Sequence, residues 1–317
     1  MMRALRVATR GSALARWQAD RVVALLEVAD PDRPRAELVV VETTGDRRPD
    51  ARIHEIGGVG VFVKEVQEAV VDGRADVAVH SAKDLPAITP DGLVLAAIPE
   101  RADPRDALVG ATLAALPTAA LVGTGSVRRR AQLSGLRPDL GFADLRGNMH
   151  TRLEKAEGFD AIVVAAAALD RLGLAERITQ RLEPSVMLPQ VGQGALAVEC
   201  RADDATTRGA LTMIDDADAR RAVAAERAFL ACLGGGCSLP VGALASVDGD
   251  TVTIEALLAA PDGRWVHRAT ATGTDPEVAG RSVAATLLAM VETPLGTPID
   301  TPIETGGDTA VESGTSP

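Results

Sequence analysis

Twice in this sequence a short apolar strand pattern runs through a turn of small and polar residues directly into a helix pattern, and this limits the fold more than any other feature. The first strand pattern, residues 5–8, is followed by Thr9-Arg10-Gly11-Ser12 and a helix with an apolar face to about Val28. The second, residues 121–123, is followed by Thr124-Gly125-Ser126 and another helix. Strands that alternate with helices predict α/β sheets, and each such turn presents free backbone N–H groups to an anion.

Further patterns complete two α/β sets. Strands are expected at residues 37–42, 77–79 and 93–98, and then at 107–110, 140–145 and 161–164; a mobile loop is expected at 45–60, with a helix at 61–72. A glycine-rich run at 191–194 leads into another strand at 195–200. We expect this strand to return to the first sheet, because at the end of the second sheet it would be hard to bury. Two α/β lobes joined by two crossings predict a hinged cleft.

The remainder of the chain indicates a smaller unit. An apolar helix at 219–233 is followed by strand-like runs at 241–247, 251–258 and 265–271 and a helix at 276–291. We therefore predict an α/β protein of two doubly wound, hinge-linked lobes, like periplasmic binding proteins of type II, plus a small C-terminal α+β domain. The expected boundaries are 1–98 with 195–214, then 99–194 and 217–292, and residues 293–317 are expected to form a disordered tail.

Charge and composition exclude several classes of function. The net charge of −11 argues against non-specific nucleic-acid binding, and no run of 18 apolar residues predicts a membrane span. The N-terminus resembles no signal peptide, and the 3 cysteines, an odd number, argue for reduced thiols in the cytoplasm. No Cys/His cluster has the spacing of a zinc site, so no metal is expected.

A candidate site follows the strand pattern at 77–79, in the run His80-Ser81-Ala82-Lys83-Asp84-Leu85-Pro86. Ligands of open α/β sheets bind at the carboxyl ends of strands, where Lys83 and Asp84 lie. Lysines occur only at positions 64, 83 and 155 in a chain that otherwise uses arginine, so Lys83 stands out. The alternative is a solvated surface ion pair.

The second lobe indicates what such a site binds. Six arginines fall between residues 123 and 152, several at junctions between strand and helix: 128, 129, 130, 137, 146 and 152. Guanidinium groups beside helix N-termini indicate a ligand with several carboxylates. Asp84 is then the one acid in a pocket built for carboxylates, which is tolerable only if a positive charge develops beside it during reaction.

The cysteines differ in their surroundings. Cys232 follows Phe229 by one helical turn and Cys200 lies in a strand, so both are expected in the core. Cys237 follows three glycines, which leave its sulfur room to face a cleft. A reactive thiol at Cys237 and an inert buried one both remain open.

Seven short motifs, in this order and spacing, resemble the porphobilinogen deaminase (hydroxymethylbilane synthase) family from about Leu5 to Val291. They are Ala8-Thr9-Arg10-Gly11-Ser12, Gly60-Val61-Phe62-Val63-Lys64-Glu65, Ala78-Val79-His80-Ser81-Ala82-Lys83-Asp84-Leu85-Pro86, Gly123-Thr124-Gly125-Ser126-Val127-Arg128-Arg129, Leu145-Arg146-Gly147-Asn148, Val191-Gly192-Gln193-Gly194-Ala195 and Gly235-Gly236-Cys237.

The resemblance implies a monomeric, cytoplasmic transferase that joins four porphobilinogens onto a dipyrromethane cofactor and then hydrolyses off a linear tetrapyrrole. It implies that Cys237 holds the cofactor through a thioether and that Asp84 is the catalytic carboxylate. The implied cofactor-binding residues are Lys83, Asp84, Thr124, Ser126, Arg128, Arg129, Arg146, Gly147 and Arg152. The implied substrate-binding residues are Arg10, Ser12, Phe62, Arg171 and Gln193.

Two rival functions remain. A two-lobed anion-binding protein of the periplasmic type would explain the lobes and the arginines, but not a third domain with Cys237. A thiol-nucleophile enzyme would need a histidine base for Cys237, and the sequence relates none of its histidines to that residue: 54, 80, 150 and 267. The resemblance also has local departures, because Glu55 and Val59 stand where many family members carry lysines, and Gly234 where Glu is frequent.

Overall fold

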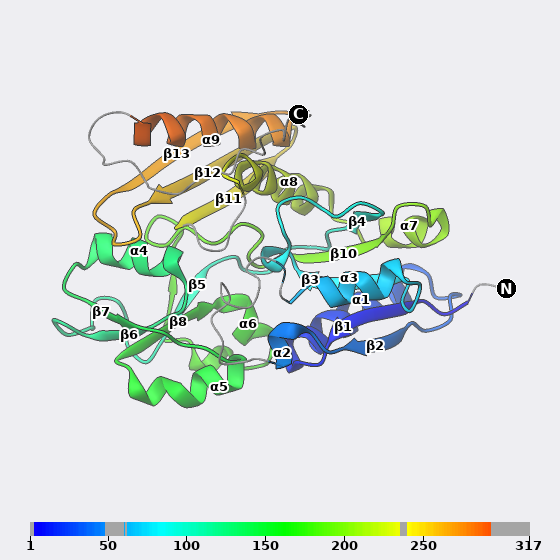
Figure 1. Ribbon diagram of the computed structural model, residues 1–317, viewed down its shortest axis with the longest axis horizontal. Helices are drawn as coiled ribbons and strands as arrows, with labels where there is room; N and C mark the ends of the chain where they lie inside the picture. The colour runs from blue at the N-terminus through cyan, green and yellow to red at the C-terminus, as the bar shows by residue number, and fades with distance from the viewer. Residues whose placement is uncertain (1–2, 48–59, 61, 235–239, 293–317) are drawn as a thin grey trace, which may run out of the picture.

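The computed structural model describes residues 3–47, 60, 62–234 and 240–292, which form three sheets with their helices (Figure 1). The first lobe contains β1 (Arg6–Arg10), α1 (Ala13–Ala29), β2 (Glu37–Val41), α2 (Thr44–Arg47), α3 (Lys64–Val71), β3 (Val77–Ser81), η2 (Ala82–Asp84), β4 (Leu93–Ala97), β10 (Leu196–Arg201) and α7 (Ala205–Thr212). The second lobe contains β5 (Asp106–Val109), β6 (Leu121–Gly123), α4 (Val127–Leu136), β7 (Gly141–Ala143), α5 (Met149–Glu154), η3 (Lys155–Gly158), β8 (Ala161–Ala165), α6 (Ala166–Arg171), η4 (Ala175–Arg177) and β9 (Gln180–Leu182). The third unit contains α8 (Ala217–Cys232), β11 (Val241–Asp248), β12 (Thr251–Ala259), β13 (Val266–Gly273) and α9 (Pro276–Glu292).

Each lobe is built on a sheet of five strands, in the orders β2-β1-β3-β10-β4 and β7-β6-β8-β5-β9. The prediction that the strand near 195–200 returns to the first sheet is confirmed, since β10 lies between β3 and β4. The two sheets are mixed rather than all parallel: β10 is antiparallel to both its neighbours, and so is β5 in the second sheet. In each sheet the antiparallel strand is the first one after the chain arrives from the other lobe. The two crossings therefore tie the lobes together symmetrically.

The two turns that opened the sequence argument form as expected. Ser12 caps α1, because its Oγ accepts a hydrogen bond from the Ala15 N–H at 3.3 Å. Ser126 caps α4 in the same way, through the Arg129 N–H at 3.4 Å. Both helices therefore start directly at the strand ends, with their N-termini at the edge where the lobes meet.

The third unit is an antiparallel sheet, β11-β12-β13, with α8 and α9 on one face (Figure 1). Ala225 and Phe229 of α8 belong to its apolar core. Ala219 and Val223 of the same helix belong instead to a cluster with Leu85 and other buried residues of the first lobe. The helix α8 therefore packs on two units at once, and the exact domain boundaries stay a prediction.

Several local predictions are wrong. Residues 45–47, expected in a loop, belong to α2 (Thr44–Arg47), and the helix expected from residue 61 begins at Lys64. The strand expected at 140–145 is only Gly141–Ala143, and α6, α7 and β9 were not predicted. Cys232 is exposed rather than in the core, whereas Cys200 is buried as expected. Leu233 packs against the core instead. It follows Phe229 by four residues and therefore lies closer to the same helix face than Cys232, which follows by three.

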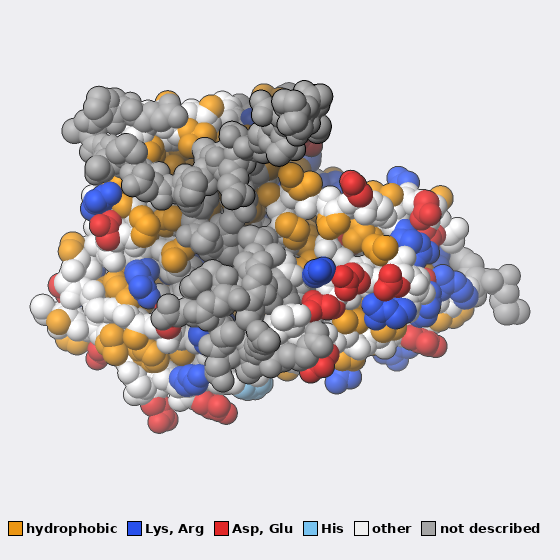
Figure 2. Space-filling model, in the orientation of Figure 1, with side chains coloured by type: hydrophobic (Ala, Val, Ile, Leu, Met, Phe, Trp, Pro, Cys, Tyr) orange, Lys and Arg blue, Asp and Glu red, His pale blue; other side chains and the backbone are white. Residues whose placement is uncertain are grey.

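The described surface carries charges of both signs. On the face shown in Figure 2, acidic and basic side chains are interspersed over the first lobe. Within the described ranges, no helix is both long and apolar enough to cross a membrane. In the same part of the chain, no group of three or more His, Cys, Asp or Glu side chains is placed to hold a metal ion.

Candidate functional site

Asp84 lies in a short 3-10 turn that follows β3 directly. Buried Ala82 and Leu85 anchor the turn on either side, and this leaves Asp84 itself partly exposed. The second crossing packs against the same turn: a Cβ on Gly192 would lie 2.9 Å from the Ala82 carbonyl carbon. Glycine at 192, with φ of +71°, permits this close approach.

Lys83 points toward the junction of the lobes. Its Nζ lies 3.4 Å from Oε1 of Gln193, which is on the second crossing. Burial of the ammonium lowers the pKa of Lys83 to about 8, and the nearby positive charge of Arg129 acts in the same direction, whereas Asp84 counteracts both. A bound anion would therefore stabilise the charged form of Lys83.

We expect Lys83→Met to stabilise the ligand-free chain at pH 7 and to lose that advantage at high pH. The pKa of Lys83 falls from 10.5 in the unfolded chain to about 8 in the fold, so the folded state releases its proton first. Holding the ammonium charged costs up to about 3 kcal/mol below pH 8, and this cost disappears as the pH rises above 10.5. Urea unfolding of the Cys237→Ser chain, with and without Lys83→Met, at pH 7 and pH 10.5 measures the difference. An equal difference at both pH values would contradict the lowered pKa.

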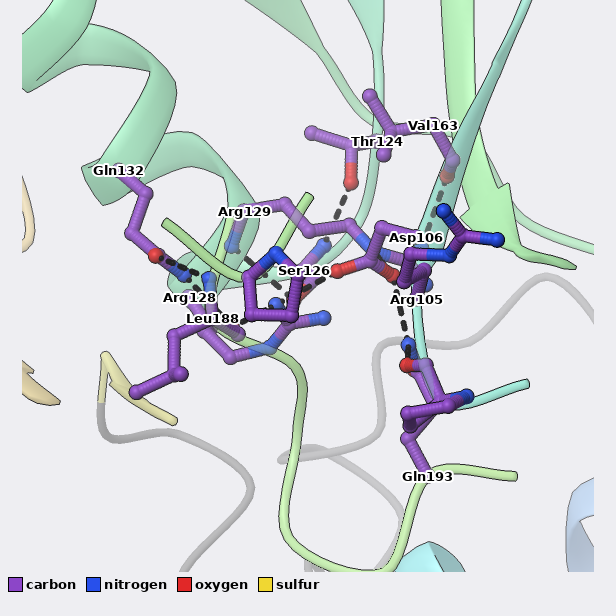
Figure 3. Close-up of polar contacts among 12 residues, drawn as sticks. Arg105, Asp106, Thr124, Ser126, Arg128, Arg129, Gln132, Val163, Leu188 and Gln193 are labelled. Carbon is purple, nitrogen blue, oxygen red and sulfur yellow. Dashed lines mark hydrogen bonds and ion pairs between the residues drawn. The ribbon is translucent and has the colours of Figure 1, made fainter. Parts of the chain in front are cut away.

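A buried carboxylate organises the arginines of the second lobe (Figure 3). Asp106 is fully buried at the start of β5, with Oδ2 2.7 Å from Arg128 Nη1 and Oδ1 2.7 Å from Arg129 Nη2. The positive charges of these two arginines hold the pKa of the Asp106 carboxyl well below its usual range, although burial opposes them. Gln193 Nε2 donates to Asp106 Oδ1 at 3.0 Å, so one amide joins Lys83 to this cluster.

Asp106 corrects two expectations from the sequence. Asp84 is not the one acid near the arginines, and Arg128 and Arg129 are partly neutralised by the protein itself. Asp106 was not singled out because it stands immediately before an apolar run, where it reads as a strand boundary. The signal that could have indicated Asp106 is its place as an acid at the edge of a buried strand, in a chain that also has two consecutive arginines, Arg128 and Arg129, which the fold buries.

Some donors in this cluster remain without a protein partner. Among the described residues, Nε and Nη2 of Arg128 and Nε of Arg146 are buried and make no hydrogen bond. Gly125 leaves space for the Arg146 guanidinium, since a Cβ there would lie 3.1 Å from its Cζ. Buried donors without partners are costly, and carboxylates of a ligand would satisfy them. The residues present therefore fit a cofactor that carries several carboxylates.

Arg152 extends the positive region toward Asp84. Its Nε donates to the carbonyl of Gly147, which has φ of +111°, at 2.9 Å. Burial lowers the pKa of Arg152 to about 10, as do the charges of Arg129 and Arg146, and the Asp84 carboxylate counteracts them. The structure thus brings Asp84 of the first lobe and the arginines of the second lobe into one electrostatic site.

The residues expected to meet the substrate come from both lobes. The Arg10 guanidinium lies over the Phe62 ring, 4.2 Å from its centroid. Arg171 Nη2 donates to the Gly194 carbonyl at 2.6 Å, and its guanidinium lies 5.7 Å from the Trp17 ring. Trp17 is expected on the apolar face of the first helix pattern, but it is 38% exposed, so it is not a core residue.

The remaining expected residues have structural partners or lie outside the described ranges. Thr124 is buried, and its Oγ1 accepts from the Ser126 N–H at 3.2 Å. Cys237 lies outside the described residues. Downstream of it, Gly242 approaches the second lobe, and a Cβ there would lie 3.4 Å from Arg128 Cδ. The start of β11 therefore lies beside the arginine cluster.

Comparisons with known proteins agree with these features. Residues 5–209 match the family model described as "Porphobilinogen deaminase, dipyromethane cofactor binding domain", and residues 220–289 match "Porphobilinogen deaminase, C-terminal domain". A porphobilinogen deaminase of Brevibacillus brevis is 49% identical over 290 residues, covering 90% of this chain and 94% of the relative. One of Acidothermus cellulolyticus is 50% identical over 295 residues, covering 90% and 88%.

A solved structure, a TRAP periplasmic solute binding protein from Desulfovibrio salexigens, covers 68% of this chain and 73% of its own at 11% identity and a TM-score of 0.41. A similarity of this size supports no inference about function. The family models and the curated relatives are decisive, because together they span most of the chain at about half identity. The chain belongs to the porphobilinogen deaminase family.

Proposed function

We propose that this chain is a hydroxymethylbilane synthase, a transferase that deaminates porphobilinogen and joins four molecules of it head to tail on a dipyrromethane primer. The linear tetrapyrrole 1-hydroxymethylbilane is then released by hydrolysis. The observation that carries the proposal is the single electrostatic site described above. In it, the charge of Asp84 on one lobe acts on Arg152 of the other lobe, and the neighbouring Arg146 has a buried Nε without a partner among the described residues. Many carboxylates to bind and one acid to do chemistry are what this reaction requires.

In this proposal the primer is attached to Cys237 and supplies the pyrrole α-carbon to which the first substrate is joined. Arg128, Arg146 and Arg152 would hold its carboxylates, together with Lys83 and Ser126. More of the Arg129 donors are already bonded within the protein, since its Nη1 also donates to the Val163 carbonyl at 2.8 Å. We assign Arg129 the role of orienting this face of the site, with Thr124 and Gly147 shaping the two turns.

Asp84 would act on the substrate. Porphobilinogen loses ammonia to form a cation with charge shared by its pyrrole nitrogen, and a carboxylate beside that nitrogen stabilises it. Asp84 is suited to this because its turn is anchored by buried neighbours while its own side chain remains partly exposed. It can also accept a proton after the new bond forms. Arg10, Ser12, Phe62 and Arg171 would line the position of the incoming substrate.

Gln193 would hold the two lobes in register rather than contact the substrate first. Its side chain is 1% exposed, and its amide nitrogen is already engaged by the Pro104 carbonyl at 2.8 Å and by Asp106. Its carbonyl oxygen faces Lys83. A movement of one lobe against the other has to change this bridge.

The test of the proposed function is the mass of the intact purified chain. We expect a mass above that of the sequence by two linked pyrrole units, and we expect Cys237→Ser to lack the excess. Cys232→Ser is the matched control, because Cys232 is exposed at the end of α8 and has no proposed role. An unmodified wild-type chain with full tetrapyrrole synthesis would overturn the primer assignment.

The two rival functions predict other results. An anion-binding protein would carry no added mass and would not consume porphobilinogen. A thiol hydrolase would need a base near Cys237, and its modification would not be a pair of pyrroles. The proposal also includes a monomeric state and a location in the cytoplasm, which size-exclusion chromatography and cell fractionation can test. The odd cysteine count supports reduced thiols and therefore the cytoplasm.

A further inference from the structure

The helix α8 reaches from the third unit to the turn that carries Asp84. Its residues Ala219 and Val223 share one buried apolar cluster with Ala82 and Leu85, which flank Lys83 and Asp84. Further along, Phe229 packs into the core of the third unit. The same helix precedes the segment that contains Cys237. A shift of α8 would therefore disturb the packing of both the third unit and the Asp84 turn.

Arg227 makes one of the polar contacts between this helix and the first lobe, and Arg220 makes others, to the carbonyls of Leu95 and Ala96 on β4. The Nη2 of Arg227 donates to Thr89 Oγ1 at 3.2 Å, across 138 positions of sequence. Thr89 lies in the segment between Asp84 and β4, five residues after the acid. Burial lowers the pKa of Arg227, and the carboxylate of Glu199 counteracts that effect. The carboxylate of Glu199 therefore acts on the guanidinium through its charge, while Thr89 accepts its hydrogen bond.

Glu199 is a fully buried acid on β10. Its Oε2 accepts a hydrogen bond from Gln67 Nε2 at 2.8 Å and lies 3.2 Å from Nε2 of buried His80. Within the described part of the chain, its Oε1 has no hydrogen-bond partner. A buried carboxylate requires positive charge nearby, and Arg227 supplies a fixed one. His80 belongs to the end of β3, only four residues before Asp84.

We propose that Arg227 is a positioning residue that couples the third unit to the Asp84 turn, by holding Thr89 in the segment that follows the turn. The proposal rests on the proposed role of Asp84. The segment after the turn is held from α8 by the hydrogen bond between Arg227 and Thr89, and Ala82 and Leu85 pack against the same helix, so a shift of the Asp84 turn has to disturb these contacts. Movement of the helix next to the cysteine segment would then be transmitted to the acid.

The test compares Arg227→Ala with Arg221→Ala on the same helix. Arg221 bonds within the third unit, to the carbonyls of Gly249 (at 2.7 Å), Asp250 and Thr274, and so controls for the loss of a guanidinium from α8. We expect amide hydrogens of residues 85–92 to exchange at least about five-fold faster in Arg227→Ala, and to be unchanged in Arg221→Ala. We expect Arg227→Lys to restore part of the protection, because a lysine keeps the positive charge and an N–H donor for Thr89 Oγ1.

Kinetics supply the second readout. A displaced acid lowers turnover more than affinity, so kcat of Arg227→Ala should fall at least about ten-fold while KM changes by less than about three-fold. In a Thr89→Ala background, Arg227→Ala should have a smaller effect on both readouts, since one shared contact is already gone. A merely structural role would lower the melting temperature without this coupling.

Two results would overturn the proposal. One is unchanged exchange of residues 85–92 in Arg227→Ala; the other is an equal fall of kcat in Arg221→Ala. Failure of the proposed function is distinguishable, because the wild-type chain would then lack the added mass and would not consume porphobilinogen. The exchange measurement needs no activity, so it tests the contact in either case.

Discussion

Replacing Asp84 by asparagine is expected to lower kcat for tetrapyrrole formation by about 10²–10⁴-fold while the chain still folds and still binds porphobilinogen. Asparagine has the same shape as aspartate but carries no negative charge. The charge matters because the substrate becomes cationic when it loses ammonia, in a site where nearby groups are themselves positive. Without Asp84, the arginines and Lys83 would repel the cation.

A single-turnover experiment on the purified variant measures this effect, with thermal unfolding recorded on the same sample. Asp91→Asn is the matched control, because Asp91 is an exposed acid in the segment that follows the Asp84 turn. We expect Asp91→Asn to react at the wild-type rate. A turnover within a few-fold of wild type for Asp84→Asn would refute the catalytic assignment.

Asp106→Asn is expected to give the largest loss of stability, about 3–5 kcal/mol in the free energy of unfolding. The carboxylate lies between two buried guanidinium groups, and its removal leaves both uncompensated. The folded pKa of Asp106 is lowered from 3.8, so its stabilisation is present above pH 3.8 and is lost as the pH falls below that value. The difference between wild type and variant should therefore shrink in acid.

Asp144→Asn provides the comparison. Asp144 forms an ion pair with Arg130, which follows Arg129 on α4, with 3.3 Å between Oδ1 and Nη2. Both side chains are more than one third exposed. Such a pair contributes little, so we expect almost no change in its unfolding curve. Urea unfolding of the three chains at pH 7 and at a pH well below 3.8 decides the matter. Equal stability losses for Asp106→Asn and Asp144→Asn would show that the buried cluster is not the support that its geometry indicates.

Local sequence patterns predict the elements that depend on neighbours in the chain. Ser12 and Ser126 cap the helices expected of them, and the strands of the third unit lie within a few residues of their predicted bounds. The short elements cannot be predicted from local patterns in this way. The three residues Gln180–Leu182 become β9 only because they pair with β5, a partner more than 70 positions away, and so no local pattern marks them.

The candidate site divides in the same way. Lys83 and Asp84 were recognisable because a charged pair follows a buried strand, and the arginines because they crowd the strand–helix junctions. Asp106, Gln193 and Arg227 act through partners far away in sequence: the arginines, Lys83 and Thr89. The pattern of one chain segment contains no information about which distant group it will meet.

The sequence by itself determined the two βα turns, the composition of a pocket for carboxylates, and the acid and cysteine that define the proposed chemistry. These depend on residue type and on short-range backbone geometry, which are local properties. The tertiary structure alone decided that β5 and β10 run antiparallel, that Asp106 shares the arginines with any ligand, and that α8 reaches the Asp84 turn. Pairing direction, burial and charge compensation arise only when distant segments exclude water together, so they appear with the fold and not before it.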